Sequence, residues 1–200
     1  MEAVWEPFEK ELKERGFTAV CGVDEAGRGP LAGPVYAAAV ILPDDIRIDG
    51  LNDSKKLSEK KREKLFDEIC EKAVCYAIAS ASEKEIDEIN ILQATFLAMR
   101  RAVDALPIKA DYVLVDGNRL PPLEQDGDTV IKGDAVCMSI AAASILAKVS
   151  RDRFMTELDK QYPEYCFLQH KGYGTKLHYE KLNEFGISPV HRKTFLKKMH

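Results

Sequence analysis

Residues 18–30 read TAVCGVDEAGRGP, a short apolar run that ends in two acids and is followed by a glycine-rich turn. Apolar, β-branched runs of this length are typical of strands, and the glycines mark where such a strand stops. Two later stretches repeat the pattern, because YVLVD ends at Asp116 and TVIKGD ends at Asp134. Strand ends open onto the crevice where α/β proteins place their sites. The stretch therefore predicts an α/β fold whose strands deliver acids to one site.

The rest of the chain predicts further strands and helices around this first strand. We expect strands over residues 18–23, 35–42, 74–81, 112–115 and 130–131, the last of them reaching Asp134. We expect helices over residues 5–12, 58–72, 90–103 and 138–161, and one that Thr175 caps and Gly186 ends. This order predicts a mixed sheet covered by helices on both faces. With no repeat or long linker, we expect a single domain over 1–200, in which about 170–200 is a basic helical segment.

Composition and charge restrict the class of protein. Of the 200 residues, 46% are hydrophobic and 31% are charged, and no apolar run approaches the roughly 18–20 residues that span a bilayer. The first residues lack an apolar signal core, and the five cysteines form no CxxC pair, so we expect a cytoplasmic protein with reduced thiols and no zinc site. The net charge is −4, but residues 170–200 carry seven Lys or Arg against two acids. That segment is either a patch for phosphates or a solvated tail.

The acids at the strand ends are candidate metal ligands. Asp24, Asp116 and Asp134 follow three separate apolar runs, and Glu25 adds a fourth carboxylate. Converging carboxylates repel one another and raise each other's pKa unless a cation lies among them. Hard cations such as Mg²⁺ prefer these ligands, and two ions about 4 Å apart can clamp a phosphodiester displacement. The competing interpretation is that each acid caps a turn. Because neighbours in a strand point to opposite faces, Asp24 and Glu25 share a site only if the chain turns there.

The glycines after the first strand do not form a dinucleotide-binding loop. Gly27, Gly29 and Gly33 give the spacing GxGxxxG, whereas a dinucleotide loop has GxGxxG. Asp24 and Glu25 would also lie beside the pyrophosphate and repel it. The glycines therefore predict a tight turn or a close approach of the backbone to a substrate.

Taken together, residues 23–34 (VDEAGRGPLAGP) resemble the signature of the type 2 ribonuclease H family, bacterial ribonuclease HII in particular. The resemblance continues in the same order over nearly the whole chain. Its further segments are DSKKLS at 53–58, VDG at 115–117, KGD at 132–134, SIAAASILAKVSRDR at 139–153, HKGYGT at 170–175 and residues 188–195. The related ribonuclease HIII group typically has lysine where Arg28 stands.

The resemblance implies a ribonuclease H-like fold, with a mixed five-stranded sheet flanked by helices and a helical C-terminal part. It implies an endonuclease that hydrolyses the RNA strand of RNA/DNA hybrids and cuts 5′ of ribonucleotides embedded in duplex DNA. Cleavage would leave 3′-hydroxyl and 5′-phosphate ends and would use two divalent ions, Mg²⁺ or Mn²⁺. A monomer without a membrane partner is the default expectation.

The resemblance also assigns roles by position. The family's four metal-binding acids match Asp24, Glu25, Asp116 and Asp134, with Asp24 expected to bridge the two ions. Gly27, Arg28 and Gly29 match the loop that senses the ribose 2′-hydroxyl, and Tyr173 matches the tyrosine that stacks against a sugar at the RNA-to-DNA junction. Further candidate phosphate contacts are Lys55, Lys56, Ser144, Lys148 and Arg151.

Two other functions predict different behaviour. A metal-free ribonuclease would use the C-terminal histidines, attack through the 2′-hydroxyl, remain active in EDTA and release a cyclic phosphate. A non-catalytic binder of hybrid duplexes would bind without cutting when Mg²⁺ is supplied. The doubled acid at Asp24 and Glu25 argues against the second function, and no clear pairing of histidines supports the first.

Overall fold

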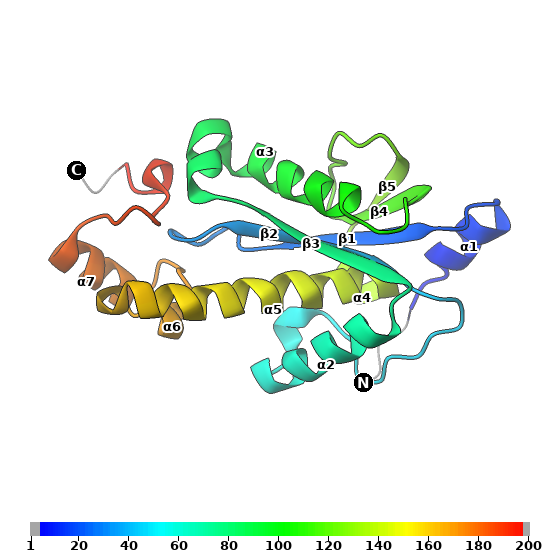
Figure 1. The fold of residues 1–200 in the computed structure, drawn as a ribbon, viewed down its shortest axis with the longest axis horizontal. Helices are drawn as coiled ribbons and strands as arrows, with labels where there is room; N and C mark the ends of the chain where they lie inside the picture. The colour runs from blue at the N-terminus through cyan, green and yellow to red at the C-terminus, as the bar shows by residue number, and fades with distance from the viewer. Residues whose placement is uncertain (1–4, 198–200) are drawn as a thin grey trace.

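The computed structural model describes residues 5–197, and Figure 1 shows them as one sheet between layers of helices. Over these residues the sheet has five strands in the order β3-β2-β1-β4-β5. They are β1 (Val20–Ala26), β2 (Val35–Ile41), β3 (Cys75–Ala81), β4 (Tyr112–Asp116) and β5 (Asp126–Val130). β1 pairs antiparallel with β2 and parallel with β4, while β3 is antiparallel to β2 and β5 is parallel to β4. The predicted mixed five-stranded sheet is confirmed.

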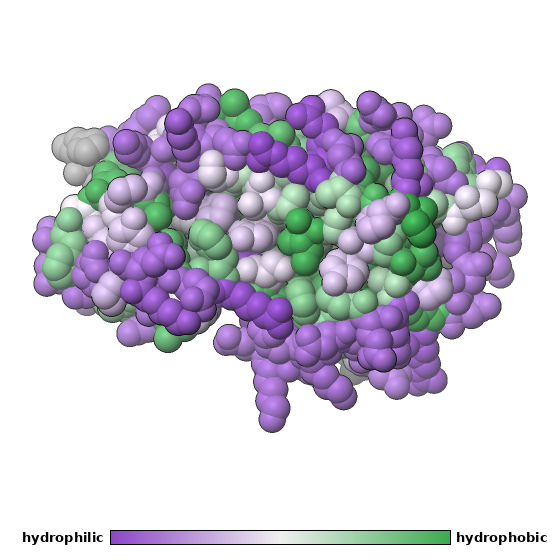
Figure 2. All heavy atoms as spheres, viewed as in Figure 1, coloured by the Kyte–Doolittle hydropathy of each residue, from purple (hydrophilic) through white to green (hydrophobic). Residues whose placement is uncertain are grey.

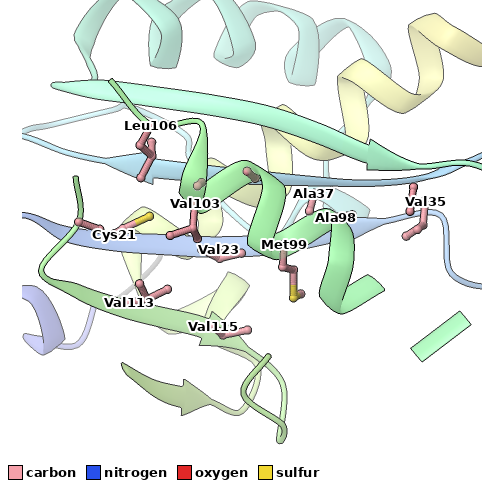
Figure 3. Close-up of a cluster of buried hydrophobic side chains, with 14 of the residues drawn as sticks. Cys21, Val23, Val35, Ala37, Ala98, Met99, Val103, Leu106, Val113 and Val115 are labelled. Carbon is pink, nitrogen blue, oxygen red and sulfur yellow. The ribbon is translucent and has the colours of Figure 1, made fainter. Parts of the chain in front are cut away.

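Long helices cover both faces of this sheet. α3 (Glu83–Asp104) packs on one face, where Val23 of β1 meets Met99 and Val103 in a buried cluster (Figure 3). α5 (Met138–Gln161) packs on the other face together with α2 (Glu59–Lys72). Gly22 of β1 faces α5, because a Cβ there would lie closer than 3.0 Å to the helix backbone. The absence of a side chain at Gly22 thus lets α5 lie directly against the central strand.

Short helices complete the described part of the chain. α1 (Phe8–Glu14) precedes β1, η1 (Ser54–Lys56) precedes α2, and α4 (Gly133–Val136) precedes α5. After α5 come η2 (Pro163–Tyr165), α6 (Phe167–His170), α7 (Lys176–Phe185) and η3 (Lys193–Phe195). These last elements bury their own apolar cluster with the end of α5. The predicted helical C-terminal part is present; residues 1–4 and 198–200 of the predicted domain, His200 included, lie outside the described residues.

Helix boundaries were predicted well where capping residues mark them. α5 covers the predicted 138–161, and α7 lies between Thr175, whose side chain accepts a hydrogen bond from the His178 amide, and Gly186. The predicted start at Asn90 is wrong, because α3 begins at Glu83 behind a capping box formed by Ser82 and Glu85. Asn90 lies at a kink instead, with φ 66°, and its side chain caps the second part of the helix.

The fifth strand lies earlier than predicted. β5 covers residues 126–130 and alternates between exposed and partly buried positions, so it lacks the apolar run by which strands were found in the sequence. Ile131 lies beyond it with 72% of its surface exposed. Asp134 therefore does not end a strand but lies in the first turn of α4.

The face drawn in Figure 2 is polar along both of its long edges. Between them runs a band of paler and green, more hydrophobic residues, at the level of β3 and α5 in Figure 1. Over residues 5–197, no helix combines the length and apolar character needed to cross a membrane.

Candidate active site

Asp24 and Glu25 both belong to β1, which continues to Ala26 before the chain turns. They lie opposite Ala38 and Ala37 of β2, so the chain does not turn between the two acids. Because neighbours in a strand point to opposite faces, the two carboxyls leave β1 on different sides. Asp24 faces α5, where Ser144 hydrogen-bonds to it. Glu25 faces α3 and lines a hollow of about 370 Å³.

Asp116 comes to the same end of β1 from the neighbouring strand, and Asp134 comes from α4. Asp116 is the last residue of β4, which pairs in parallel with β1. The amide of Gly133 donates a hydrogen bond of 2.7 Å to Asp116 Oδ1, which ties the start of α4 to the end of β4. Asp134 follows directly and is 6% exposed. Neighbouring strands and this bond thus gather the four predicted acids at one end of the sheet.

The negative charges of the carboxyls repel one another. Burial, followed by the charges of Glu25 and Asp116, raises the pKa of Asp24 well above its ordinary value. Burial and the charge of Asp116 also raise the pKa of Glu25, against the opposing effect of Arg28. The pKa of Asp116 is raised by burial and by Asp134. The four acids therefore form a connected set of like charges that a cation would relieve.

The acids suit a hard divalent cation by their chemistry. All four supply carboxylate oxygens, which such cations prefer. Basic side chains face them at present: Lys55 Nζ lies 3.4 Å from Asp134 Oδ2, and Arg28 Nη1 lies 3.5 Å from Glu25 Oε1. As the side chains stand between residues 5 and 197, no three Asp, Glu, His or Cys residues form a group that could hold a metal ion. The donor set fits the ion, although the side chains as placed are not grouped around one.

The glycine-rich loop follows β1 and is held by its carbonyl groups. The buried guanidinium of Arg192 donates hydrogen bonds to the carbonyls of Gly27, Arg28 and Gly33, at 2.6, 2.9 and 2.8 Å. Gly27 has φ +95°, a conformation that favours glycine. The side chain of Arg28 is half exposed beside Glu25. The predicted loop residues are thus adjacent to the acids and face the solvent through Arg28.

Tyr173 lies against this loop, although it comes 144 positions after Gly29 in the chain. A Cβ on Gly29 would stand 3.8 Å from the Tyr173 ring. The guanidinium carbon of Arg151 lies 5.8 Å from the centre of the same ring. Tyr173 is 43% exposed, so part of its ring remains accessible. The structure therefore brings the predicted stacking tyrosine to the predicted glycine loop.

Two of the additional candidates are buried. Arg151 is 0% exposed and donates to the carbonyls of Ala32, Pro34 and Lys171 at 3.2, 3.3 and 3.0 Å. Ser144 is 3% exposed and shares a hydrogen bond of 2.9 Å with Ser54. Both side chains are thus buried and bound to other parts of the protein, and their phosphate contacts stay predictions.

The three lysines lie at different distances from the acids. Lys55 is largely exposed and faces Asp134, so it borders the site. Lys56 is exposed and lies 3.9 Å from Asp53. Lys148 is engaged by Asp152 at 2.7 Å, one helical turn away on α5. The structure therefore brings Lys55 to the acids and shows Lys56 and Lys148 paired with other carboxylates.

The interior roles of Arg192, His178 and His191 were missed by sequence reasoning, which counted all three in the basic segment 170–200 and considered the histidines only for a metal-free ribonuclease. All three are at most 1% exposed and bind the backbone or one another. Arg192 and His191 lie in the stretch 188–195 that resembles the family, which was the available signal. Asn118 and Arg119, next to Asp116, line the hollow beside Glu25.

Known proteins resemble this chain along most of its length. A sequence model of the family described as Ribonuclease HII matches residues 21–200. A protein of Caldicellulosiruptor saccharolyticus named ribonuclease HII is 56% identical over 190 residues, which cover 95% of this chain and 93% of that protein. One of Albidiferax ferrireducens with the same name is 62% identical over 176 residues, 88% of this chain and 85% of its own length. The crystal structure of ribonuclease H2 from Pyrococcus horikoshii OT3 is 30% identical, has a TM-score of 0.73, and matches over 88% of this chain and 93% of that one.

Proposed function

The chain belongs to the ribonuclease HII family and is a ribonuclease H, and on that premise we propose that it cuts RNA/DNA hybrids in their RNA strand and duplex DNA 5′ of embedded ribonucleotides. The products would be 3′-hydroxyl and 5′-phosphate ends. The observation that carries this proposal is the gathering of Asp24, Glu25, Asp116 and Asp134 at one end of the sheet, with pKa values raised in three of them. Such a set is suited to divalent ions and to phosphodiester chemistry.

The four acids would hold two divalent ions, Mg²⁺ or Mn²⁺. When bound, such ions supply a nucleophile from water and stabilise the charge on the departing oxygen. Asp24 is oriented for this by the Ser144 hydroxyl and by the Glu25 amide, which donates a hydrogen bond of 2.7 Å to Asp24 Oδ1. Lys55 and Arg28, the cations that now face the acids, would be free to meet phosphates once the ions bind.

The loop and Tyr173 would read the substrate. Gly27, Arg28 and Gly29 lie beside the acids, where a ribose 2′-hydroxyl and its phosphate would be tested. The 2′-hydroxyl distinguishes RNA from DNA at a given position. The exposed part of the Tyr173 ring offers a flat apolar surface for the neighbouring sugar. We expect little preference for base sequence, because backbone contacts carry none.

The test is cleavage of a duplex with a single embedded ribonucleotide, with the cut position mapped. We expect cutting on the 5′ side with Mg²⁺ or Mn²⁺ and none in EDTA. Asp24→Asn should bind the duplex normally and lose roughly 10²–10³-fold in rate, the size of a lost electrostatic contact to the transition state. Asp49→Asn is the matched control, because that side chain is 78% exposed and forms an ion pair with Arg47.

Three results would contradict the proposal. Near-normal cleavage by the Asp24→Asn variant would remove the acids from the mechanism. Activity in EDTA with a cyclic phosphate product would indicate a metal-free ribonuclease instead. Binding without cleavage when Mg²⁺ is supplied would indicate a binding protein.

We further propose that the protein works as a monomer in the cytoplasm, with nucleic acid as its partner. The five cysteines support a reducing compartment, since all of them are free thiols in the described residues. Gel filtration with light scattering tests the oligomeric state, and a dimer at micromolar concentration would overturn it.

A further inference from the structure

We propose that a buried hydrogen-bond relay from His191 through His178 to the Tyr173 carbonyl is a positioning device for the tyrosine that reads the junction. The inference rests on the proposed function of Tyr173 and goes beyond it, because it assigns a role to two residues that touch no substrate. It is carried by the contacts of the two imidazoles and by their burial. It is also carried by the contacts that Arg192, the residue after His191, makes with the glycine-rich loop.

The hydrogen-bond partners determine which ring nitrogen carries each proton. The amide of Ser188 donates to His191 Nδ1 at 3.1 Å, so that nitrogen is an acceptor and His191 carries its proton on Nε2. His191 Nε2 lies 3.0 Å from His178 Nε2 and must donate to it. His178 is then protonated on Nδ1, which donates to the Tyr173 carbonyl at 2.9 Å. His191 Nδ1 also accepts from the Ser188 hydroxyl at 2.7 Å. Every ring nitrogen of the pair is therefore engaged, and these contacts set the direction of the relay.

Both imidazoles must remain neutral for this relay to exist. A second proton on His178 would go to Nε2 and oppose the Nε2–H group of His191, and one on His191 would go to Nδ1 and oppose the Ser188 amide. The surroundings oppose that proton: burial, then the adjacent imidazoles, lowers the pKa of His178 and of His191 to about 4. His170 stacks on His178 at 4.2 Å between ring centroids, and the ring of Tyr165 lies 4.9 Å from that of His191. No carboxylate pairs with either ring among the described residues.

The relay acts on the peptide that carries the Tyr173 ring. The Tyr173 carbonyl accepts from His178 Nδ1 and from the Thr175 amide, and the Tyr173 amide donates to the His170 carbonyl. The backbone on both sides of the side chain is therefore fixed. The remaining freedom of the ring lies in its own side-chain torsions, against Gly29 and Arg151.

The same segment also holds the glycine loop. Arg192 follows His191 and binds the carbonyls of Gly27 and Arg28 through its guanidinium. Backbone hydrogen bonds also join residues 188–192 to the glycine-rich loop. The Arg192 amide donates to the Leu31 carbonyl, and the Gly33 amide donates to the Val190 carbonyl. Residues 188–192 thus fix the tyrosine and the 2′-hydroxyl-sensing loop relative to each other.

The first experiment observes the relay directly in the whole protein. Two-dimensional NMR of ¹⁵N-labelled imidazoles distinguishes a ring protonated on Nδ1 from one protonated on Nε2. We expect His178 as the Nδ1–H form and His191 as the Nε2–H form at pH 7.5. Finding His178 with its proton on Nε2 would overturn the relay, whether or not the enzyme cuts ribonucleotides.

The second experiment uses two substitutions of equal polarity. The amide nitrogen of asparagine lies as many bonds from the main chain as Nδ1 of histidine, which donates, and the amide oxygen of glutamine lies as many as Nε2, which accepts from His191. His178→Asn therefore retains a donor to Tyr173, whereas His178→Gln retains only the contact with His191. On the single-ribonucleotide duplex we expect kcat/KM to fall about tenfold in His178→Gln, the effect of one lost hydrogen bond, and less than about threefold in His178→Asn.

A double-mutant cycle separates positioning from general stability. If His178 acts through the tyrosine, His178→Gln should cause no further loss in a Tyr173→Ala background, measured below the unfolding midpoint of each variant. Equal losses in the asparagine and glutamine variants, or a full tenfold loss in the Tyr173→Ala background, would overturn the proposal. Failure of the unsubstituted enzyme to cut the duplex would instead refute the proposed function, and the NMR result would then decide the relay alone.

Discussion

Gly27→Ala should destabilise the protein through two separable effects. Gly27 has φ +95°, and an alanine in a left-handed conformation costs about 1–2 kcal/mol. The new Cβ would also lie closer than 3.0 Å to the Arg151 side chain. That side chain cannot swing away without breaking its three hydrogen bonds to backbone carbonyls. Overpacking of this kind costs about 1–3 kcal/mol, so the sum is roughly 2–5 kcal/mol.

Two other glycines isolate these contributions. Gly16 has φ +100° and nothing within 4 Å of its Cβ position, so Gly16→Ala should cost only the about 1–2 kcal/mol of backbone strain. Gly29 would place its Cβ in ordinary contact with the Tyr173 ring, 3.8 Å away, so Gly29→Ala should leave stability nearly unchanged. Urea denaturation of the three variants, with equal slopes, measures the free energies of unfolding. Equal losses in Gly27→Ala and Gly16→Ala would refute the assignment of Arg151 as a rigid support of the loop.

Three further predictions concern stability. Because burial lowers the pKa of His178 and His191 from 6.5 to about 4, the unfolded chain binds their protons first as the pH falls, so their contribution to the free energy of unfolding should be complete above pH 6.5 and decline toward pH 4. The raised pKa values of Asp24, Glu25 and Asp116 act in the opposite direction, so the decline is measured as the difference between urea titrations of the protein and of the His178→Asn variant, and the same difference at every pH would contradict it. Arg192→Met leaves three loop carbonyls without their donor and should cost about 2–4 kcal/mol by denaturation, with Arg192→Lys losing less; no loss would show that water replaces the guanidinium. Ser82→Ala removes one half of the capping box of α3 and should lower the unfolding free energy by about 1 kcal/mol, seen as a lower thermal midpoint, while an unchanged midpoint would show that the cap contributes nothing.

Local signals in the sequence were sufficient for much of the fold. The stretch at 138–161 has no glycine or proline, and Thr175 and Gly186 are strong helix boundaries, so α5 and α7 were predicted to the residue. β5 could not be found in this way, because its sequence DGDTV has no apolar period and its position depends on pairing with β4. In the same way, β1 continues through Asp24 and Glu25 because β2 pairs with it there, which the two acids alone do not indicate.

The acids of the site could be predicted from the sequence. The buried residues that hold the site in place could not. Acids at the ends of apolar runs are conspicuous, and family resemblance supplied Tyr173. The interior roles of Arg151 and Arg192 were not predictable, because arginine is among the residues most seldom buried. Their burial follows from the glycine loop, whose carbonyls turn inward and require donors from distant parts of the chain.

Asp24 and Glu25 point to opposite faces of the sheet, so each of them lies next to a different hydrophobic cluster. Glu25 leaves β1 toward the interior beneath α3, and Asp24 toward the one beneath α5. Their strand partners, Ala37 and Ala38, are each fully buried in one of these interiors. A larger residue on either side would alter the thickness of that layer and shift one acid without the other. The volumes of these two alanines therefore help to set the positions of the two acids separately, one from each side of the sheet.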